Sequence, residues 1–196
     1  WFYKDTLLRR AYLSFVRAYA SPSGRDLVRA DRLVANSQWS AALVKQYCGV
    51  PHLPVIYPPV WASFPRVSWQ EKEDAFVMIG RIASEKRIEA AIRVLGSLRG
   101  RGHRLILHLC GEIPQDSYGR MITELCASNH EWITCHGRVS GSLKSNLLAR
   151  AKYGIHTCAH EAFGISVAEM VKAGAIVFFN GYLLHRSLPN YAKSGY

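Results

Sequence analysis

The chain has 196 residues, of which 49% are hydrophobic, so it can bury the core of one domain or of one domain with an appendage. Its 15 Gly and 8 Pro residues exclude collagenous and disordered chains. The formal net charge of +11 implies attraction to phosphate, nucleic acid or anionic lipid. Because Lys and Arg recur singly and no RNA- or DNA-binding module is recognisable, we expect no nucleic-acid partner.

The five cysteines are widely spaced and form no C-x-x-C pair, which argues against a zinc knuckle or a redox dithiol. Most of them stand within apolar runs, as Cys110 does. They therefore predict buried thiols of a reducing compartment. They are Cys48, Cys110, Cys126, Cys135 and Cys158.

Apolar residues recur at helical spacing over Trp1 to Ala30, with a break at Ser21 to Gly24, and this pattern predicts an interrupted amphipathic helix. Its basic residues exclude a spanning helix and fit no secretory signal, so we expect a cytoplasmic protein. Two interpretations of the helix stay open, namely packing against a neighbouring domain and peripheral contact with the inner or cytoplasmic membrane face. Without an initiator Met, Trp1 looks like the edge of a fragment.

The next segment predicts a short strand over Asp31 to Asn36 and a helix over Gln38 to Tyr47 that Ser37 caps. A second short strand is expected at Val55 to Tyr57. The stretch from Trp61 to Asp74 then reads as a linker, so we place domain boundaries at 1–60, 61–74 and 75–196.

From Ala75 onward, apolar strand-like runs alternate with amphipathic helical segments. This alternation predicts an α/β fold, a Rossmann-like parallel sheet with helices on both faces, whose ligands bind beyond the carboxyl ends of the strands. The expected strands are Ala75–Ile79, Arg104–Cys110, Trp132–His136, Tyr153–Thr157 and Ala175–Phe179, and the expected helices are Ser84–Leu98, Asp116–Ala127, Ser142–Ala151 and Ile165–Ala173.

Gly80, Arg81 and Lys86 follow the first of these strands. Glycine permits a tight turn, Arg81 supplies a fork of donors, and Lys86 is expected in the first turn of a helix capped by Ser84. Two cations beside a helix N-terminus would suit a diphosphate. Taken alone, the segment could also be a solvated edge.

Two carboxylates, Glu161 and Glu169, flank the turn after the strand that ends near Thr157. We expect Glu161 in the loop and Glu169 about one turn into the following helix, whose first N–H groups would face an anion. Carboxylates bind sugars and ribose by accepting hydrogen bonds from pairs of hydroxyls. The structural alternative makes Glu161 a capping acid and Glu169 a surface residue.

This segment resembles the E-x7-E motif of the large retaining glycosyltransferase family with the GT-B fold, often called family 4. Ala35 to Ser40 is similar to the end of that family's N-terminal domain, Val55 to Val60 to its interdomain crossover, and Gly80-Arg81 with Lys86 to its donor-phosphate motif. The resemblance implies that the chain is the C-terminal, donor-binding half of such an enzyme. Residues 1–60 would then end the acceptor domain, and 75–196 would form the donor-nucleotide domain, incomplete at its C-terminal end.

The resemblance also implies a role for each matching residue. Arg81, Lys86 and Glu161 would be catalytic, the two cations by stabilising the departing diphosphate and Glu161 by contacting hydroxyls of the donor sugar. Glu169 would bind the ribose. The remaining donor contacts would come from Gly80, Gly111, Arg138, Val139, Phe163, Gly164 and Ile165.

The implied substrates are a nucleotide diphosphate sugar, with GDP, UDP and ADP left open as the nucleotide, and a glycan or lipid-linked acceptor. His156-Thr157, Phe163 to Ile165 and Tyr57 to Val60, which replaces the commoner Asn-Gly exit, look most like mannosyltransferases that extend lipid-linked oligosaccharides. No cofactor or metal is expected, because the histidines show no ligand spacing. Two further hypotheses are a sugar-nucleotide-binding module without chemistry and a basic protein that binds nucleic acid or a membrane surface. After Phe179, Gly181 to Arg186 departs from the family pattern, which leaves the acceptor side open.

Overall fold

The structure is a computed structural model that describes residues 33–158, 161 and 163–179, together with positions 7, 10, 11, 14 and 15. The chain divides into two compact units, Trp1–Tyr57 and Pro58–Tyr196. Most of the helix predicted over Trp1 to Ala30 lies outside the described residues, as does the segment Gly181 to Arg186.

The first unit contains helix α3 (Gln38–Cys48), which agrees with the predicted helix. Its N-cap Ser37 accepts a hydrogen bond from the Ser40 N–H, and Gly49 ends it in the left-handed conformation at φ 69°. The strands predicted on either side are reduced, among the described residues, to one parallel bridge between Ala35 and Val55. The pairing stops there because Ser37, two residues beyond Ala35, is already the N-cap of α3.

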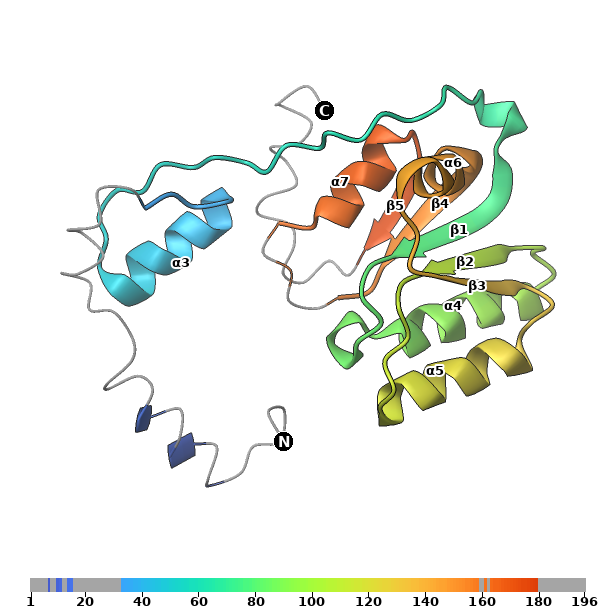
Figure 1. The fold of residues 1–196 in the computed structure, drawn as a ribbon, viewed down its shortest axis with the longest axis horizontal. Helices are drawn as coiled ribbons and strands as arrows, with labels where there is room; N and C mark the ends of the chain where they lie inside the picture. Colours follow the sequence, from blue (N-terminus) through green and yellow to red (C-terminus); the bar gives the residue numbers. More distant parts are fainter. Residues whose placement is uncertain are drawn as a thin grey trace. The chain divides into compact units, whose positions relative to one another are not determined.

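The second unit is built on a five-stranded parallel sheet in the order β3-β2-β1-β4-β5 (Figure 1). The predicted fold class is therefore confirmed. The strands are β1 (Glu73–Ile79), β2 (Ile106–Cys110), β3 (Ile133–Gly137), β4 (Ala151–His156) and β5 (Ile176–Phe179). The helices are α4 (Ile88–Gly100), α5 (Ser117–Ser128), α6 (Gly141–Arg150) and α7 (Ile165–Lys172), and two short 3-10 turns are η1 (Trp69–Glu71) and η2 (Ser84–Lys86).

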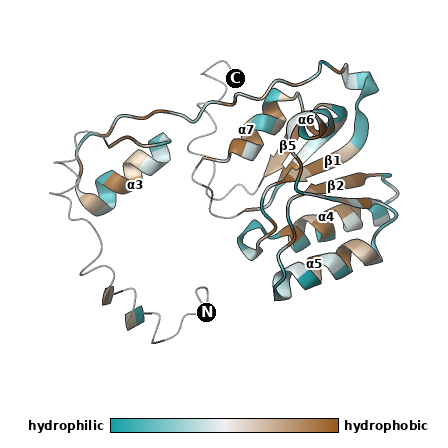
Figure 2. Ribbon diagram, in the orientation of Figure 1, coloured by the Kyte–Doolittle hydropathy of each residue, from teal (hydrophilic) through white to brown (hydrophobic). Residues whose placement is uncertain are grey.

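Alternate side chains of β1 belong to two hydrophobic cores, one on each face of the sheet. Phe76 and Met78 pack with α4 and α5, whereas Val77 packs with α6 and α7. Figure 1 shows these helix pairs on opposite sides of the strands. In Figure 2, α4 and α5 alternate hydrophobic and hydrophilic residues, while the inner strand β2 is largely hydrophobic, as expected for a strand covered on both faces. The edge strand β5 is hydrophobic as well, but its Ile176 and Phe178 are each 52% exposed.

The helix predicted from Ser84 is wrong at its start. Ser84–Lys86 is a 3-10 turn, Arg87 adopts the left-handed conformation at φ 50°, and α4 begins only at Ile88. Ser84 therefore does not cap the helix, and Lys86 does not lie in its first turn. The turn forms because Lys86 and Arg87 donate to carbonyls three residues back, and because the Thr157 hydroxyl donates to the carbonyl oxygens of both residues.

Two smaller predictions also need correction. Ala151 does not end the helix predicted over Ser142 to Ala151 but opens β4, because α6 stops at Arg150. The cysteines are not uniformly buried: Cys110, Cys126 and Cys158 are, but Cys135 is exposed and Cys48 is half-buried. Cys135 is exposed because it lies on β3, an edge strand of the sheet.

The order of the strands places a topological switch point between β1 and β4. The chain proceeds outward from β1 through β2 to β3 and then returns to the other side of β1 as β4. In parallel α/β sheets, ligands bind beyond the carboxyl ends of the strands at such a point. No helix among the described residues is long and apolar enough to cross a membrane.

Candidate functional site

The loops after β1, β2 and β3 are held together by backbone hydrogen bonds at the carboxyl edge of the sheet. Gly80 donates to the Cys110 carbonyl at 3.0 Å, and Gly111 donates to the Gly137 carbonyl at 2.8 Å. A Cβ atom at Gly111 would lie only 2.0 Å from the Gly80 carbonyl oxygen. The close approach of these loops therefore requires glycine at position 111.

These loops enclose a cleft of about 290 Å³. Five of the residues that the sequence predicts to bind the donor line it, namely Gly80, Arg81, Gly111, Arg138 and Val139. Cys110, Glu112 and Lys144 contribute further walls. The cleft is thus open, partly polar and bordered by three cations.

Arg81 and Lys86 each pair with a carboxylate. The Arg81 guanidinium pairs with Glu85 at 3.0 Å and its side chain is 77% exposed. The Lys86 ammonium donates to Glu161 Oε2 at 2.6 Å, and both of these side chains are largely buried. A smaller hollow is lined by Gly80, Arg81 and Lys86 together, so the structure brings the predicted diphosphate residues to one place.

Glu161 has two basic neighbours, because His156 Nε2 also lies 3.5 Å from its Oε2. The His156 ring and the Lys86 ammonium lower the pKa of Glu161 from its usual 4.5 to about 2, although burial opposes them. Since His156 Nε2 makes no hydrogen bond of good geometry, the firm contact is that of Lys86. Glu161 is therefore an anion at neutral pH.

Glu169 forms a second pair, in which the Lys144 ammonium donates to Oε1 at 2.6 Å. The Glu169 side chain is only 12% exposed, so it is not the surface residue of the structural alternative. Lys144 comes from α6 and Glu169 from α7, which places this pair on the face of the sheet opposite α4. The lysine lines the cleft and the carboxylate lies beside it.

The helix after the turn, α7, begins at the residue that the sequence predicts. Gly164 is its N-cap in the left-handed conformation at φ 79°, and the helix begins at Ile165. The Phe163 side chain is buried, so only the backbone of that residue could reach a ligand. The first turn of α7 therefore starts in the loop that carries Glu161.

Three residues of the site were not assigned to it from the sequence. Lys144 lies seven residues beyond the end of β3, whereas site residues were sought only directly after each strand. His156 ends β4 as a polar residue in an apolar strand, a signal that could have been used. Thr157 holds the Lys86 and Arg87 carbonyls across the switch point, which no spacing in the sequence indicates.

The profile of the family described as "Glycosyl transferases group 1" matches residues 60–187. The chain belongs to this family, as its motifs predict. Among curated proteins, it is 25% identical over 190 residues to a mouse (Mus musculus) protein named GDP-Man:Man(3)GlcNAc(2)-PP-Dol alpha-1,2-mannosyltransferase. That match covers 89% of this chain and 39% of the mouse protein, so the chain spans well under half of this relative.

Solved structures of glycosyltransferases share the fold. WaaG, described as a glycosyltransferase involved in lipopolysaccharide biosynthesis, is 20% identical with a TM-score of 0.62 over 99% of this chain and 54% of WaaG. HepE of Anabaena, solved with UDP and glucose, is 19% identical with a TM-score of 0.61 over 79% of this chain and 47% of HepE. The pneumococcal O-GlcNAc transferase GtfA, solved with UDP and GlcNAc, is 18% identical with a TM-score of 0.56 over 75% of this chain and 29% of GtfA.

Proposed function

We propose that the protein containing this chain is a retaining glycosyltransferase that transfers mannose or a similar hexose from a nucleotide diphosphate sugar to a glycan or lipid-linked acceptor. One observation carries the proposal. In a member of the glycosyl transferases group 1 family, two lysine–carboxylate pairs, Lys86–Glu161 and Lys144–Glu169, stand at the ligand-binding edge of the sheet. Each pair supplies a cation for phosphate or base and a carboxylate for hydroxyls.

Donor binding would replace the contact between Lys86 and Glu161 with contacts from each residue to the donor. A diphosphate near Gly80 would draw the Lys86 ammonium and the exposed Arg81 guanidinium toward its oxygens. Glu161 would then be free to accept hydrogen bonds from the sugar hydroxyls. Before the donor binds, the Lys86 ammonium would thus keep Glu161 ionised and balance its negative charge.

The second pair would bind the nucleoside. Glu169 would accept from both ribose hydroxyls, and Lys144 would turn toward the cleft. The base would lie against Arg138 and Val139, and the backbone of Phe163, Gly164 and Ile165 would meet sugar and phosphate. In this proposal, every predicted donor-binding residue would contact the same ligand.

The reaction would break the bond between the anomeric carbon and the diphosphate oxygen and form a bond from that carbon to an acceptor oxygen. The acceptor hydroxyl would lose its proton to an oxygen of the leaving phosphate. Arg81 and Lys86 would stabilise the negative charge that develops on the diphosphate, and removal of one such preorganised donor typically costs about 10²–10³ in rate.

The choice of mannose and of a lipid-linked acceptor is supported by the mouse relative, whose name specifies GDP-mannose and a dolichol-linked glycan. UDP stays an alternative, because HepE and GtfA were solved with that nucleotide. A cytoplasmic protein that meets its lipid acceptor at the membrane face would fit these substrates.

A module that binds the sugar nucleotide without chemistry is the second candidate. It is favoured because we assign every described residue of the candidate site to the donor and none to an acceptor. The two functions differ in one measurable respect, since only the transferase turns over donor in the presence of acceptor.

The test uses the complete protein and a thermal-shift panel of GDP, UDP and ADP, followed by transfer from radiolabelled sugar nucleotides. A ligand at 100 times its dissociation constant should stabilise the protein by about 2.7 kcal/mol. We expect GDP to stabilise most and GDP-mannose to be the donor. Lys86→Met should lose both effects, whereas Asp74→Asn, which breaks an exposed pair with Lys152, should keep them. Binding without transfer would support the non-catalytic module, and no nucleotide binding would overturn both candidates.

A further inference from the structure

His156 is buried at the end of β4, with 2% of its surface exposed. Its Nε2 atom has no hydrogen-bond partner among the described residues. Native proteins seldom leave a buried ring nitrogen in this state, because the atom has lost its contact with water without replacing it. Its nearest acidic neighbour, Glu161 Oε2, lies 3.5 Å away, so an ion-pair contact and no hydrogen bond of good geometry faces this nitrogen.

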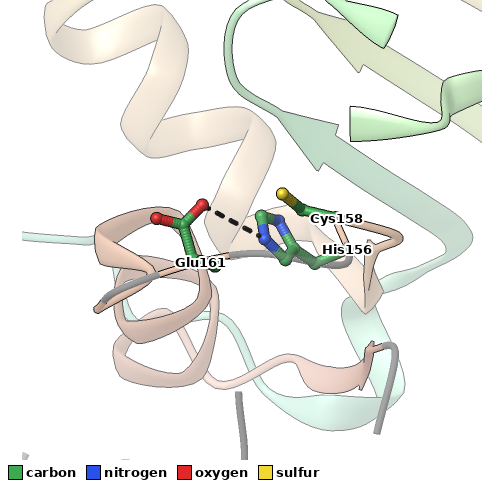
Figure 3. A group of neighbouring side chains, drawn as sticks. All are labelled: His156, Cys158 and Glu161. Atoms are coloured by element: carbon green, nitrogen blue, oxygen red, sulfur yellow. Dashed lines mark ion pairs between the residues drawn. The ribbon is translucent and has the colours of Figure 1, made fainter. Parts of the chain in front are cut away.

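Two other metal-binding side chains lie beside this histidine. His156, Cys158 and Glu161 each offer one ligand atom, and the three atoms lie within 4.8 Å of one another (Figure 3). The Cys158 side chain is 1% exposed, so two of the three groups are buried. Figure 3 shows the carboxylate and the sulfur approaching the imidazole from the loop that follows β4.

The chemistry of the three groups selects the cation. Imidazole nitrogen, thiolate sulfur and carboxylate oxygen suit zinc and similar borderline or soft ions, whereas magnesium and calcium prefer all-oxygen sites. Ligand bonds of about 2.0–2.3 Å would require the three side chains to close by small rotations. Such a site would have three protein ligands and leave a fourth position open.

We propose that His156, Cys158 and Glu161 form a binding site for a soft divalent cation such as zinc, and that its occupation inhibits donor binding. The inhibition rests on the proposed function, in which Glu161 holds the donor sugar. A cation on Glu161 would displace the Lys86 ammonium and occupy the carboxylate that the sugar needs. The cation would act as an inhibitor rather than as a resident cofactor, so transfer itself would not require it.

The metal site is tested first, by titrating the complete protein with Co²⁺, an optical substitute for zinc. We expect one equivalent to produce a thiolate-to-cobalt charge-transfer band that zinc then abolishes. Cys158→Ser should lose the band. Cys135→Ser is the matched control, because it removes an exposed thiol on β3, and it should keep the band.

Because Cys158→Ser could lose the band by misfolding, a second variant, Glu161→Gln, tests the site independently. Circular dichroism checks that both variants are folded. Glu161→Gln keeps the thiol and should keep the band, but with cobalt affinity reduced by about tenfold or more. The proposal is overturned if the unsubstituted protein gives no band, or if the band disappears in Cys135→Ser and persists in Cys158→Ser.

The inhibition is tested by calorimetry with a nucleotide diphosphate and the corresponding nucleotide sugar. Zinc should remove most of the additional affinity that the sugar confers, and Cys158→Ser should abolish this zinc effect. Comparing zinc with no zinc within each variant corrects for zinc bound by the diphosphate. A cobalt band without any zinc effect overturns the inhibition. If no nucleotide binds at all, the proposed function fails, and the cobalt band alone still decides the metal site.

Discussion

At the carboxyl edge of the sheet, each carboxylate that we assign to the donor is neutralised by a lysine from another element. Lys86 precedes α4 and meets Glu161 from the loop after β4, while Lys144 of α6 meets Glu169 of α7. A largely buried carboxylate needs such a partner, because desolvation of an unpaired charge is costly. The pairs therefore stabilise these carboxylates and define the contacts that a ligand has to replace.

Glu169→Ala is expected to weaken nucleotide binding through loss of the ribose contacts. A charge-assisted hydrogen bond contributes about 1.5–3 kcal/mol, so the affinity should fall at least tenfold. Calorimetry with the normal nucleotide and its 2′,3′-dideoxy analogue measures the change, and the analogue should bind the variant and the unsubstituted protein equally weakly. Asp74→Ala, which breaks an exposed pair with Lys152, is the control. Unchanged affinity of Glu169→Ala would remove this residue from the site.

Glu161 should make the stability of the protein depend on acid. Its pKa falls from 4.5 to about 2 in the folded state, so its contribution is fully present above pH 4.5 and is lost as the pH falls toward 2. Glu161→Gln should remove a pH-dependent term of about 1–3 kcal/mol over this window. Urea unfolding at several pH values measures it.

Two further variants identify the cause of the lowered pKa of Glu161. Lys86→Met should reduce the loss of stability between pH 4.5 and about 2 more than His156→Gln does. The reason is that the lysine makes the shorter contact with Glu161, at 2.6 Å, compared with 3.5 Å for the histidine. The opposite order would make the histidine the main partner. If the free energy of unfolding of Glu161→Gln depended on pH as that of the unsubstituted protein does, Glu161 would not be paired in the folded state.

At the scale of the elements, the site depends on how closely the loops after β1, β2 and β3 approach one another. Gly111 allows the contact with Gly80, and Thr157 fixes the carbonyls at the turn before α4. The alternation of the sequence is sufficient to predict the strands and helices, because strands buried on both faces are apolar and the helices are amphipathic. The 3-10 turn at Ser84 was missed because it is stabilised by Thr157, a residue far away in the sequence.

Gly111→Ala is expected to destabilise the second unit by about 1–3 kcal/mol, because its Cβ would force apart the loops after β1 and β2. Nucleotide affinity should fall with it, since the cleft is lined by both loops. Gly100→Ala, at the end of α4, has no atom within 4 Å of the added Cβ and should be neutral or slightly stabilising. Urea unfolding of both variants provides the measurement, and equal stability would show that the loops separate freely.

At the scale of the whole molecule, all the described residues of the candidate site belong to the second unit, from Pro58 onward. We therefore expect this unit to bind a donor without a partner domain. Transfer also requires an acceptor held against the anomeric carbon, and positioning of this kind can supply about 7–11 kcal/mol of barrier lowering. Binding and transfer should therefore separate when the chain is studied alone.

We expect these 196 residues to bind the nucleotide diphosphate with most of the affinity of the complete protein, but to transfer sugar slowly or not at all. Calorimetry and a radiolabelled transfer assay on the same preparation measure the two properties, with the complete protein as reference. Transfer at the rate of the complete protein would place the acceptor site within this chain. Absence of nucleotide binding to the chain, while the complete protein binds, would show that the donor site needs further residues.

The sequence alone determined the class of fold, the family and the identity of the motif residues. These properties depend on local patterns: apolar periodicity builds the sheet and its covering helices, and Arg81, Lys86, Glu161 and Glu169 keep characteristic positions after strands. The tertiary structure alone decided which lysine pairs with which carboxylate, and that Lys144 and His156 belong to the site. It also decided that the helix predicted from Ser84 begins only after Arg87. Such contacts join residues that are distant in the chain, and only packing of the loops at the carboxyl edge of the sheet brings them within hydrogen-bonding distance.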